Sequence, residues 1–136
     1  MLNLYGITKA LFLSCGRTLK RGTLMNICFY DNIELAVNEQ SVVLIDRVYC
    51  LNFNEFIEDT WEQLKQVYLV LPQYLAESHP CSMWFGEEGV STYHLYASVE
   101  PSGLQIVGEL SMEQWELWES AFHAQLSRYS FPSFEC

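Results

Sequence analysis

Residues 111–126 read SMEQWELWESAFHAQL and place two tryptophans in one helical segment, which decides how the fold closes. Ser111 and Gln114 have the spacing of a capping box, in which each side chain bonds a backbone N–H of the other residue. At about 100° per residue, the large apolar side chains form one stripe and the acids lie outside it. We therefore predict a helix over 112–129 whose core-facing stripe is Trp115, Trp118, Phe122, Leu126 and Tyr129.

A second amphipathic helix is predicted over 53–71, within the stretch NFNEFIEDTWEQLKQVYLVLP. Asn52 and Glu55 again have capping-box spacing, and Pro72 is typical of a helix end. The same helical period separates an apolar face from an acidic one. The predicted core-facing side chains are Phe56, Ile57, Trp61, Leu64, Val67, Tyr68 and Leu71.

Segments rich in β-branched and aromatic residues precede the first predicted helix. LMNICFYD (24–31), IELAV (33–37) and SVVLIDRVYCLNF (41–53) are separated by turn-forming residues and favour three antiparallel strands. Burial of Cys28 and Cys50 is expected, because a cysteine inside an apolar run is usually a small core residue.

The second half of the chain shows the same pattern. CSMWF (81–85), VSTYHLYASVE (90–100) and LQIVGELS (104–111) are predicted strands separated by GEEG and PSG. Gly103 is expected to take a positive φ in the second turn. The fold class is thus α+β: an antiparallel sheet of about five or six strands, with both helices packed on one face, in an order near βββα-βββα. At 136 residues the chain is predicted to form a single domain.

Charge is unevenly distributed along the chain. The net charge is −10, yet residues 1–24 hold four cations and no acid, so the other 112 residues carry 17 acids against three cations, a net of −14. This basic leader is interpreted as a transit segment, as sequence upstream of a start at Met25, or as the first strand or helix. The acidic body repels nucleic acid and anionic membranes, and it favours a basic protein partner or serves solubility.

Five cysteines without a C-x-x-C pair argue against a complete disulfide framework. The sequence therefore predicts reduced thiols and a cytoplasmic location. The oligomeric state is not constrained by the sequence.

Motifs for catalysis are absent from the sequence. It contains no dinucleotide-binding glycine pattern, Walker A loop, nucleophile elbow or H-E-x-x-H, and its histidines and cysteines lack a recognised metal-ligand spacing. Two adjacent acids in the turn at 86–89 do not suit glycosidase chemistry, which needs carboxyl groups roughly 5–9.5 Å apart across the sugar. We therefore expect a protein that is not an enzyme and that uses no cofactor or metal.

The leading hypothesis is a small acidic binding protein that neutralises a basic protein partner such as a nuclease toxin, in the manner of an immunity protein, antitoxin or nucleic-acid-mimicking inhibitor. One alternative is a small-molecule-binding or enzymatic domain with a pocket on the sheet lined by Tyr93, Tyr96, Trp84 or His94. Another is an oligomeric structural subunit with an apolar patch near residues 131–134. The residues predicted to bind the partner are Glu55, Glu58, Asp59, Glu62, Glu87 and Glu88.

Overall fold

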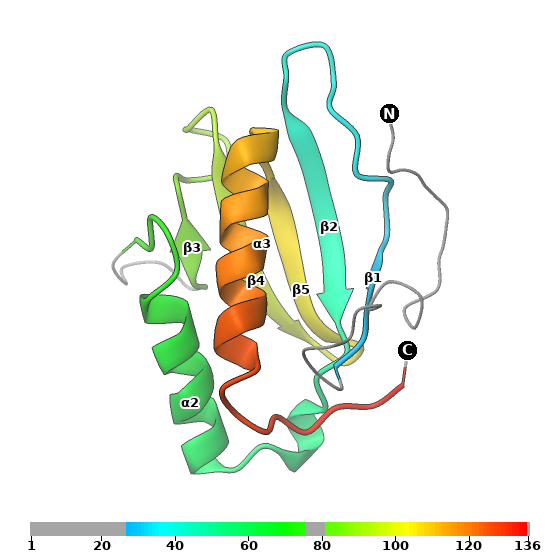
Figure 1. The fold of residues 1–136 in the computed structure, drawn as a ribbon, viewed down its shortest axis with the longest axis vertical. Helices are drawn as coiled ribbons and strands as arrows, with labels where there is room; N and C mark the ends of the chain where they lie inside the picture. Colours follow the sequence, from blue (N-terminus) through cyan, green and yellow to red (C-terminus); the bar gives the residue numbers. More distant parts are fainter. Residues whose placement is uncertain (1–26, 76–80, 136) are drawn as a thin grey trace.

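The sheet organises the fold, which is known from a computed structural model that describes residues 27–75 and 81–135. The basic leader at 1–24 lies outside the described residues. Five antiparallel strands are arranged in the order β1-β2-β5-β4-β3 (Figure 1). The strands are β1 Phe29–Asp31, β2 Val43–Tyr49, β3 Met83–Trp84, β4 His94–Glu100 and β5 Gly103–Leu110.

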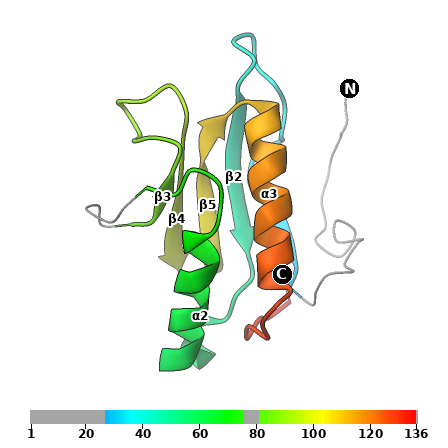
Figure 2. The ribbon, with the colours of Figure 1, turned by 60° about the vertical axis from the view of Figure 1, so that its left-hand side comes forward.

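Two α-helices pack on the same face of this sheet, as seen in both ribbon views (Figures 1 and 2). The short 3-10 helix η2, Phe53–Glu55, precedes α2, Glu58–Leu69, and α3, Met112–Leu126, closes the fold. The predicted α+β class with two helices on one face is confirmed. The described elements follow the order ββα-βββα, one strand fewer than the predicted βββα-βββα.

The missing strand is the segment predicted at 33–37. Most of it is exposed, and only Val37 forms an isolated bridge, to Val43 at the start of β2. The side chain of Asn38 accepts two backbone N–H bonds, from Gln40 and Val42, and so closes a turn directly after the segment. Because no neighbouring strand extends alongside it, this segment forms one arm of a long β1–β2 loop.

The turn between β4 and β5 is the one predicted from PSG. Gly103 has φ 139°, and a Cβ at this position would lie 2.2 Å from the carbonyl oxygen of Tyr49. Both facts require glycine, because other residues rarely adopt this φ and the neighbouring backbone leaves no space. The prediction for Gly103 is confirmed.

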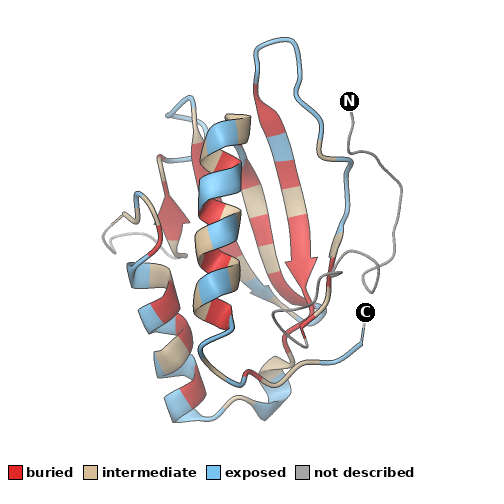
Figure 3. Cartoon of the chain, viewed as in Figure 1, coloured by how far each residue is buried: buried red, intermediate tan, exposed pale blue. Residues whose placement is uncertain are grey.

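The aromatic face of α3 forms the centre of the core (Figure 3). Trp115 and Trp118 are 2% and 0% exposed, and their rings stack with centroids 5.9 Å apart. Trp118 also meets the edge of Trp84 from β3 and packs on Phe122, with centroid distances of 5.2 and 4.8 Å. The predicted capping box is present, with Ser111 and Gln114 bonding each other's backbone N–H groups. The prediction that both tryptophans belong to the core is confirmed.

The start of α2 differs from the prediction. Asn52 accepts a hydrogen bond from the Asn54 N–H, so it caps η2 and not α2. Phe56 is extended, at φ −76° and ψ 136°, which ends η2, and α2 starts after Ile57. The hydroxyl of Thr60 accepts the Ile57 N–H, but the Ile57 side chain offers no acceptor in return. The second helix is therefore shorter than the predicted 53–71.

The placement of Trp61 in the core was wrong, because this residue is 41% exposed. Its ring stacks on Phe53, at 5.2 Å and 7°, and tilts against Phe56 at 4.8 Å. These two residues precede α2, so the three rings form a cluster outside the main core. Leu64 and Val67 of α2 are buried as predicted, whereas in the first turn the inward residue is Thr60 and not Trp61.

The C-terminal tail packs against the body of the protein. Ser133 forms a bridge with Leu51, the Asn52 N–H donates to the Pro132 carbonyl, and Phe131 is buried. Cys50 is buried as predicted, whereas Cys28 is only half-buried, and Cys50 is disulfide-bonded. The expectation that all five thiols are reduced is therefore wrong for Cys50.

Candidate functional site

The acidic ridge, defined as Glu55, Glu58, Asp59 and Glu62, lies fully on the surface. Glu58 and Glu62 occupy one face of α2, and the Glu62 carboxylate accepts a hydrogen bond of 3.0 Å from Gln66. Glu55 belongs to η2, so Glu55 and Asp59 do not share a continuous helix. The ridge is thus a band over η2 and the first turns of α2.

Glu87 and Glu88 are also exposed, but they lie far from the ridge. They belong to the loop 85–93 between β3 and β4, at the upper end of the molecule in Figure 1, whereas α2 begins at the lower end. Within the loop, the Glu87 N–H donates to the hydroxyl of Ser91 at 3.0 Å. The structure therefore does not bring the six predicted partner-binding residues into one cluster.

A nearly uniform negative charge characterises the described part of the chain. It contains sixteen acids against Arg47, Lys65 and Arg128, so its formal net charge is −13. Arg47 is buried, which leaves Lys65 and Arg128 as the exposed cations among the described residues. The field at this surface is consequently more negative than the net charge of the whole chain suggests.

Arg47 anchors a buried polar cluster that the sequence analysis missed. Its guanidinium donates from Nε and Nη2 to both carboxylate oxygens of Asp31, at 2.7 and 3.1 Å, and from Nη1 to Glu119. Nη1 also lies 3.3 Å from the Tyr49 hydroxyl, which is 2.8 Å from Nε2 of His123. The cluster connects β1, β2 and α3. The available signal was the alternation in β2, because Arg47 occupies an inward position between two apolar ones.

The electrostatics of this cluster suit a structural role. Burial lowers the pKa of Arg47, but Asp31, Tyr49 and Glu119 outweigh that effect and hold the pKa above its ordinary value. Burial raises the pKa of Tyr49 and lowers that of His123, so near neutral pH the tyrosine stays protonated and the histidine neutral. In the neutral tautomer that carries its proton on Nδ1, Nε2 of His123 accepts a hydrogen bond from the Tyr49 hydroxyl, which itself accepts one from Arg47.

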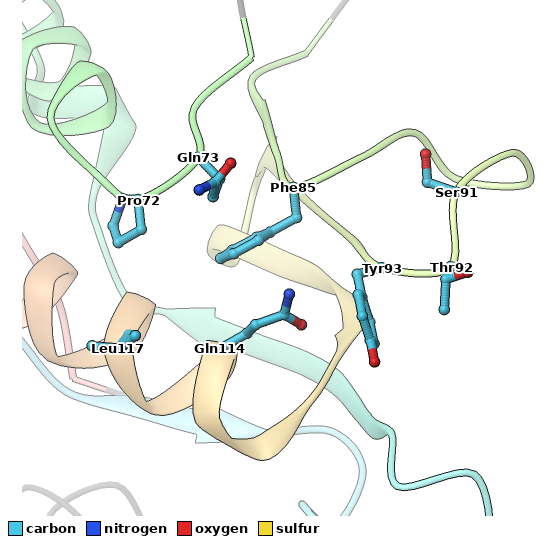
Figure 4. Close-up of a pocket in the computed structure, with 8 residues that line it drawn as sticks. All are labelled: Pro72, Gln73, Phe85, Ser91, Thr92, Tyr93, Gln114 and Leu117. Atoms are coloured by element: carbon cyan, nitrogen blue, oxygen red, sulfur yellow. The ribbon is translucent and has the colours of Figure 1, made fainter.

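A surface hollow of about 440 Å³ lies between the end of α2, the start of α3 and the loop 85–93. In Figure 4, Phe85 and Tyr93 flank the Gln114 side chain, with Pro72 and Leu117 on one side and the loop hydroxyls on the other. We call this hollow the α2–α3 groove; it is lined by Pro72, Gln73, Phe85, Ser91, Thr92, Tyr93, Gln114 and Leu117.

Of the residues expected to line a pocket on the sheet, Tyr93 alone lines this groove. Trp84 and His94 are buried, and Tyr96 points away from the helices because its neighbours in β4, Leu95 and Ala97, face the core. The groove thus lies at the end of the helical layer. Sequence periodicity could not reveal it, because two of its walls are irregular segments.

Among the described residues, no three His, Cys, Asp or Glu side chains lie close enough to hold a metal ion. No helix in that part of the chain is long and apolar enough to cross a bilayer. Comparison of the chain with protein-family models, curated proteins and solved structures finds no match in any of the three.

Proposed function

We propose that this chain is a small acidic binding protein that engages and neutralises a basic protein partner. The observation that carries the proposal is the charge of the described surface, where Lys65 and Arg128 are the exposed cations among sixteen acids. Complementary charge accelerates association and selects partners, and a basic toxin that acts on nucleic acid must present a cationic site. The same field disfavours direct binding of nucleic acid or anionic membranes.

The acidic ridge is the proposed first contact. Its carboxylates are exposed, and Lys65 is the only cation of α2. Like charges four residues apart on a helix are slightly destabilising, so the mutual repulsion of Glu58 and Glu62 opposes the fold. A basic partner would relieve this repulsion.

Affinity capture tests the proposal. The immobilised chain is exposed to a lysate of its native cells at low ionic strength, and bound proteins are eluted with salt and identified. The association rate of each purified captured protein is then compared for wild type, for Glu58→Gln/Glu62→Gln, and for Glu34→Gln/Glu39→Gln. The last variant removes the same charge from the exposed β1–β2 loop and is the matched control.

A partner that meets the ridge should associate severalfold more slowly with the ridge variant than with wild type or the control. The difference should shrink at high salt, because the screening length is about 8–10 Å at physiological ionic strength and shorter above it. An association rate that does not depend on salt would contradict the proposed function. Equal rates for the two double variants at low salt would exclude the ridge as the contact surface but would leave the proposed function standing.

The second candidate, a small-molecule-binding or enzymatic domain, draws on the α2–α3 groove and its Tyr93. It has less support, because the other predicted pocket residues do not reach the groove. The structural-subunit alternative keeps only part of its predicted patch, since Phe131 is buried against the body whereas Phe134 is 39% exposed.

The proposed location is the cytoplasm, on the basis of the odd number of scattered cysteines. The disulfide at Cys50 argues against it, because disulfides are rare in a reducing compartment. Alkylation of thiols in intact cells, followed by mass measurement, decides between the two. Alkylation of all five cysteines would support a cytoplasmic location. Alkylation of only three would contradict it, because two cysteines would then be joined in a disulfide.

A further inference from the structure

Exposed apolar residues line the α2–α3 groove or lie close in sequence to residues that line it. Leu117, which lines it, is 60% exposed, and Val90, next to the lining residue Ser91, is 78% exposed. Leu69 and Val70, at the end of α2, are exposed and lie within three residues of Pro72. A single exposed apolar residue is ordinary, whereas several around one hollow indicate a binding surface.

An acidic side chain flanks the same groove on α3. Glu113 is exposed and lies one helical turn before the lining residue Leu117, on the same face of the helix. On the opposite wall, Glu87 is tied to Ser91 by its backbone N–H. No Lys or Arg lines the groove. The lining is therefore neutral, with Phe85, Tyr93 and Leu117 as its large apolar side chains, and the exposed acids Glu113 and Glu87 belong to the elements that form it.

The groove is held in shape by an unusual backbone arrangement. Gln73 and Phe85, on neighbouring segments of one wall, have φ of 60° and 72°, values uncommon for residues other than glycine. The Phe85 N–H donates to the Gln73 carbonyl at 2.9 Å, which connects the two strained residues directly. Such strain persists where surrounding structure enforces it and is frequent at binding sites. This wall is thus fixed in the absence of a ligand.

We infer that the α2–α3 groove receives a large apolar side chain of the basic partner, flanked in that partner by Lys or Arg residues. The inference rests on the proposed function and adds where, and by what chemistry, the partner docks. The apolar side chains of the lining select the central side chain, and the neighbouring carboxylates select the cations beside it. A volume of about 440 Å³ is within the usual range of ligand sites, roughly 300–1,000 Å³.

The test uses two blocked peptides of equal charge, KKFKK and KKSKK, titrated into the isotope-labelled full chain by NMR. KKFKK should bind about tenfold more tightly, because burial of an aromatic ring adds a hydrophobic contribution that serine lacks. Its largest amide shifts should fall on groove residues such as Phe85, Tyr93 and Leu117. The shifts caused by KKSKK should instead be spread over the acidic surface.

Leu117→Gln is the decisive variant, with Leu44→Gln as its control. Both leucines are exposed, but Leu44 lies in β2 between the inward residues Val43 and Ile45 and so points to the opposite face of the sheet. Leu117→Gln should abolish the tenfold preference for KKFKK and leave KKSKK binding unchanged. Leu44→Gln should preserve the preference.

The outcomes separate this inference from the proposed function. Equal, salt-sensitive binding of the two peptides would overturn the groove and leave the charge-driven function standing. Absence of binding by either peptide at low salt would contradict the function as well. Equal affinity of the groove for KKFKK and for the uncharged peptide GGFGG would also overturn the inference. The flanking acids would then have no role in binding, and a neutral ligand would explain the groove better than a basic partner.

Discussion

The two helices carry similar tryptophan-bearing amphipathic patterns, yet they use them differently (Figure 3). In α3, Trp115 and Trp118 are sealed between the helix and the sheet, whereas Trp61 of α2 is 41% exposed. Helix α3 begins at its predicted capping box, and helix α2 begins several residues after its own. The comparison shows that a helical stripe identifies a buried face reliably only when the start of the helix is also known.

The largest expected difference between the helices is the stability lost on removing a tryptophan. Trp115→Ala should lower the free energy of unfolding by about 3–5 kcal/mol, because it leaves a cavity in the aromatic core. Trp61→Ala should lower it by about 1 kcal/mol, the size expected for lost contacts between partly exposed aromatic rings. Chemical denaturation of the two variants measures both values.

Equal losses of stability for the two variants would show that Trp61 contributes as much to the fold as Trp115. Trp61→Phe provides the control, because a phenylalanine can keep the ring contacts with Phe53 and Phe56. It should recover most of the stability that Trp61→Ala loses.

The second prediction concerns pH and the inner side of α3. Burial lowers the pKa of His123 in the folded protein, despite the opposing effect of Glu119. As the pH falls below the ordinary histidine pKa of about 6.5, the unfolded chain therefore binds more protons than the folded chain. The stability that neutral His123 contributes above that pH is consequently lost below it. The slope from one group cannot exceed about 1.4 kcal/mol per pH unit.

Denaturation curves of wild type and His123→Gln between pH 7.5 and 5.5 isolate this contribution. The variant should lose less stability than wild type as the pH falls through that range. A steeper loss in the variant would mean that the imidazole is better stabilised as a cation in the fold.

Much of the fold could be predicted from the sequence because local patterns suffice for it. Composition and flanking turn residues predicted the strand that forms β2, and the turn chemistry at Gly103 predicted the β4–β5 hairpin. The failures share another cause. The segment 33–37 has the composition of a strand but no strand beside it, and Trp61 has the right period but follows an interruption at Phe56. Both depend on tertiary neighbours that periodicity does not encode.

The candidate site was less predictable for the same reason. The exposure of the acids on α2 follows from the helical period, but the α2–α3 groove needs three segments distant in sequence. The ion pair of Arg47 with Asp31 and Glu119 likewise joins two strands and a helix. A buried arginine requires a charge partner, but no local pattern in the sequence identifies Asp31 or Glu119 as that partner.

The helix caps provide a third test of the comparison. Ser111→Ala should lower stability by about 1 kcal/mol, because the Gln114 N–H loses its acceptor at the start of α3. Ile57→Ser should raise stability by roughly 0.5–1 kcal/mol, because Ile57 is 65% exposed and gives α2 no side-chain acceptor. Thermal and chemical denaturation should agree in sign. A destabilised Ile57→Ser protein would show that the isoleucine makes contacts its exposure does not suggest.

The smallest expected effect separates the acidic face of α2 from its fold. Glu58→Gln/Glu62→Gln removes a like-charged pair at i, i+4 and should change stability by no more than a few tenths of a kcal/mol, with any change favourable. The gain from relieved repulsion is small because Glu58 lies in the first turn, where the helix dipole favours an acid. The hydrogen bond from Gln66 is kept, because Gln66 can still donate to an amide oxygen at position 62. Denaturation at low and high salt should therefore give nearly the same result for both proteins. A loss above about 1 kcal/mol would make the ridge part of the structure, and slower association of this variant could then no longer be assigned to lost contacts with a partner.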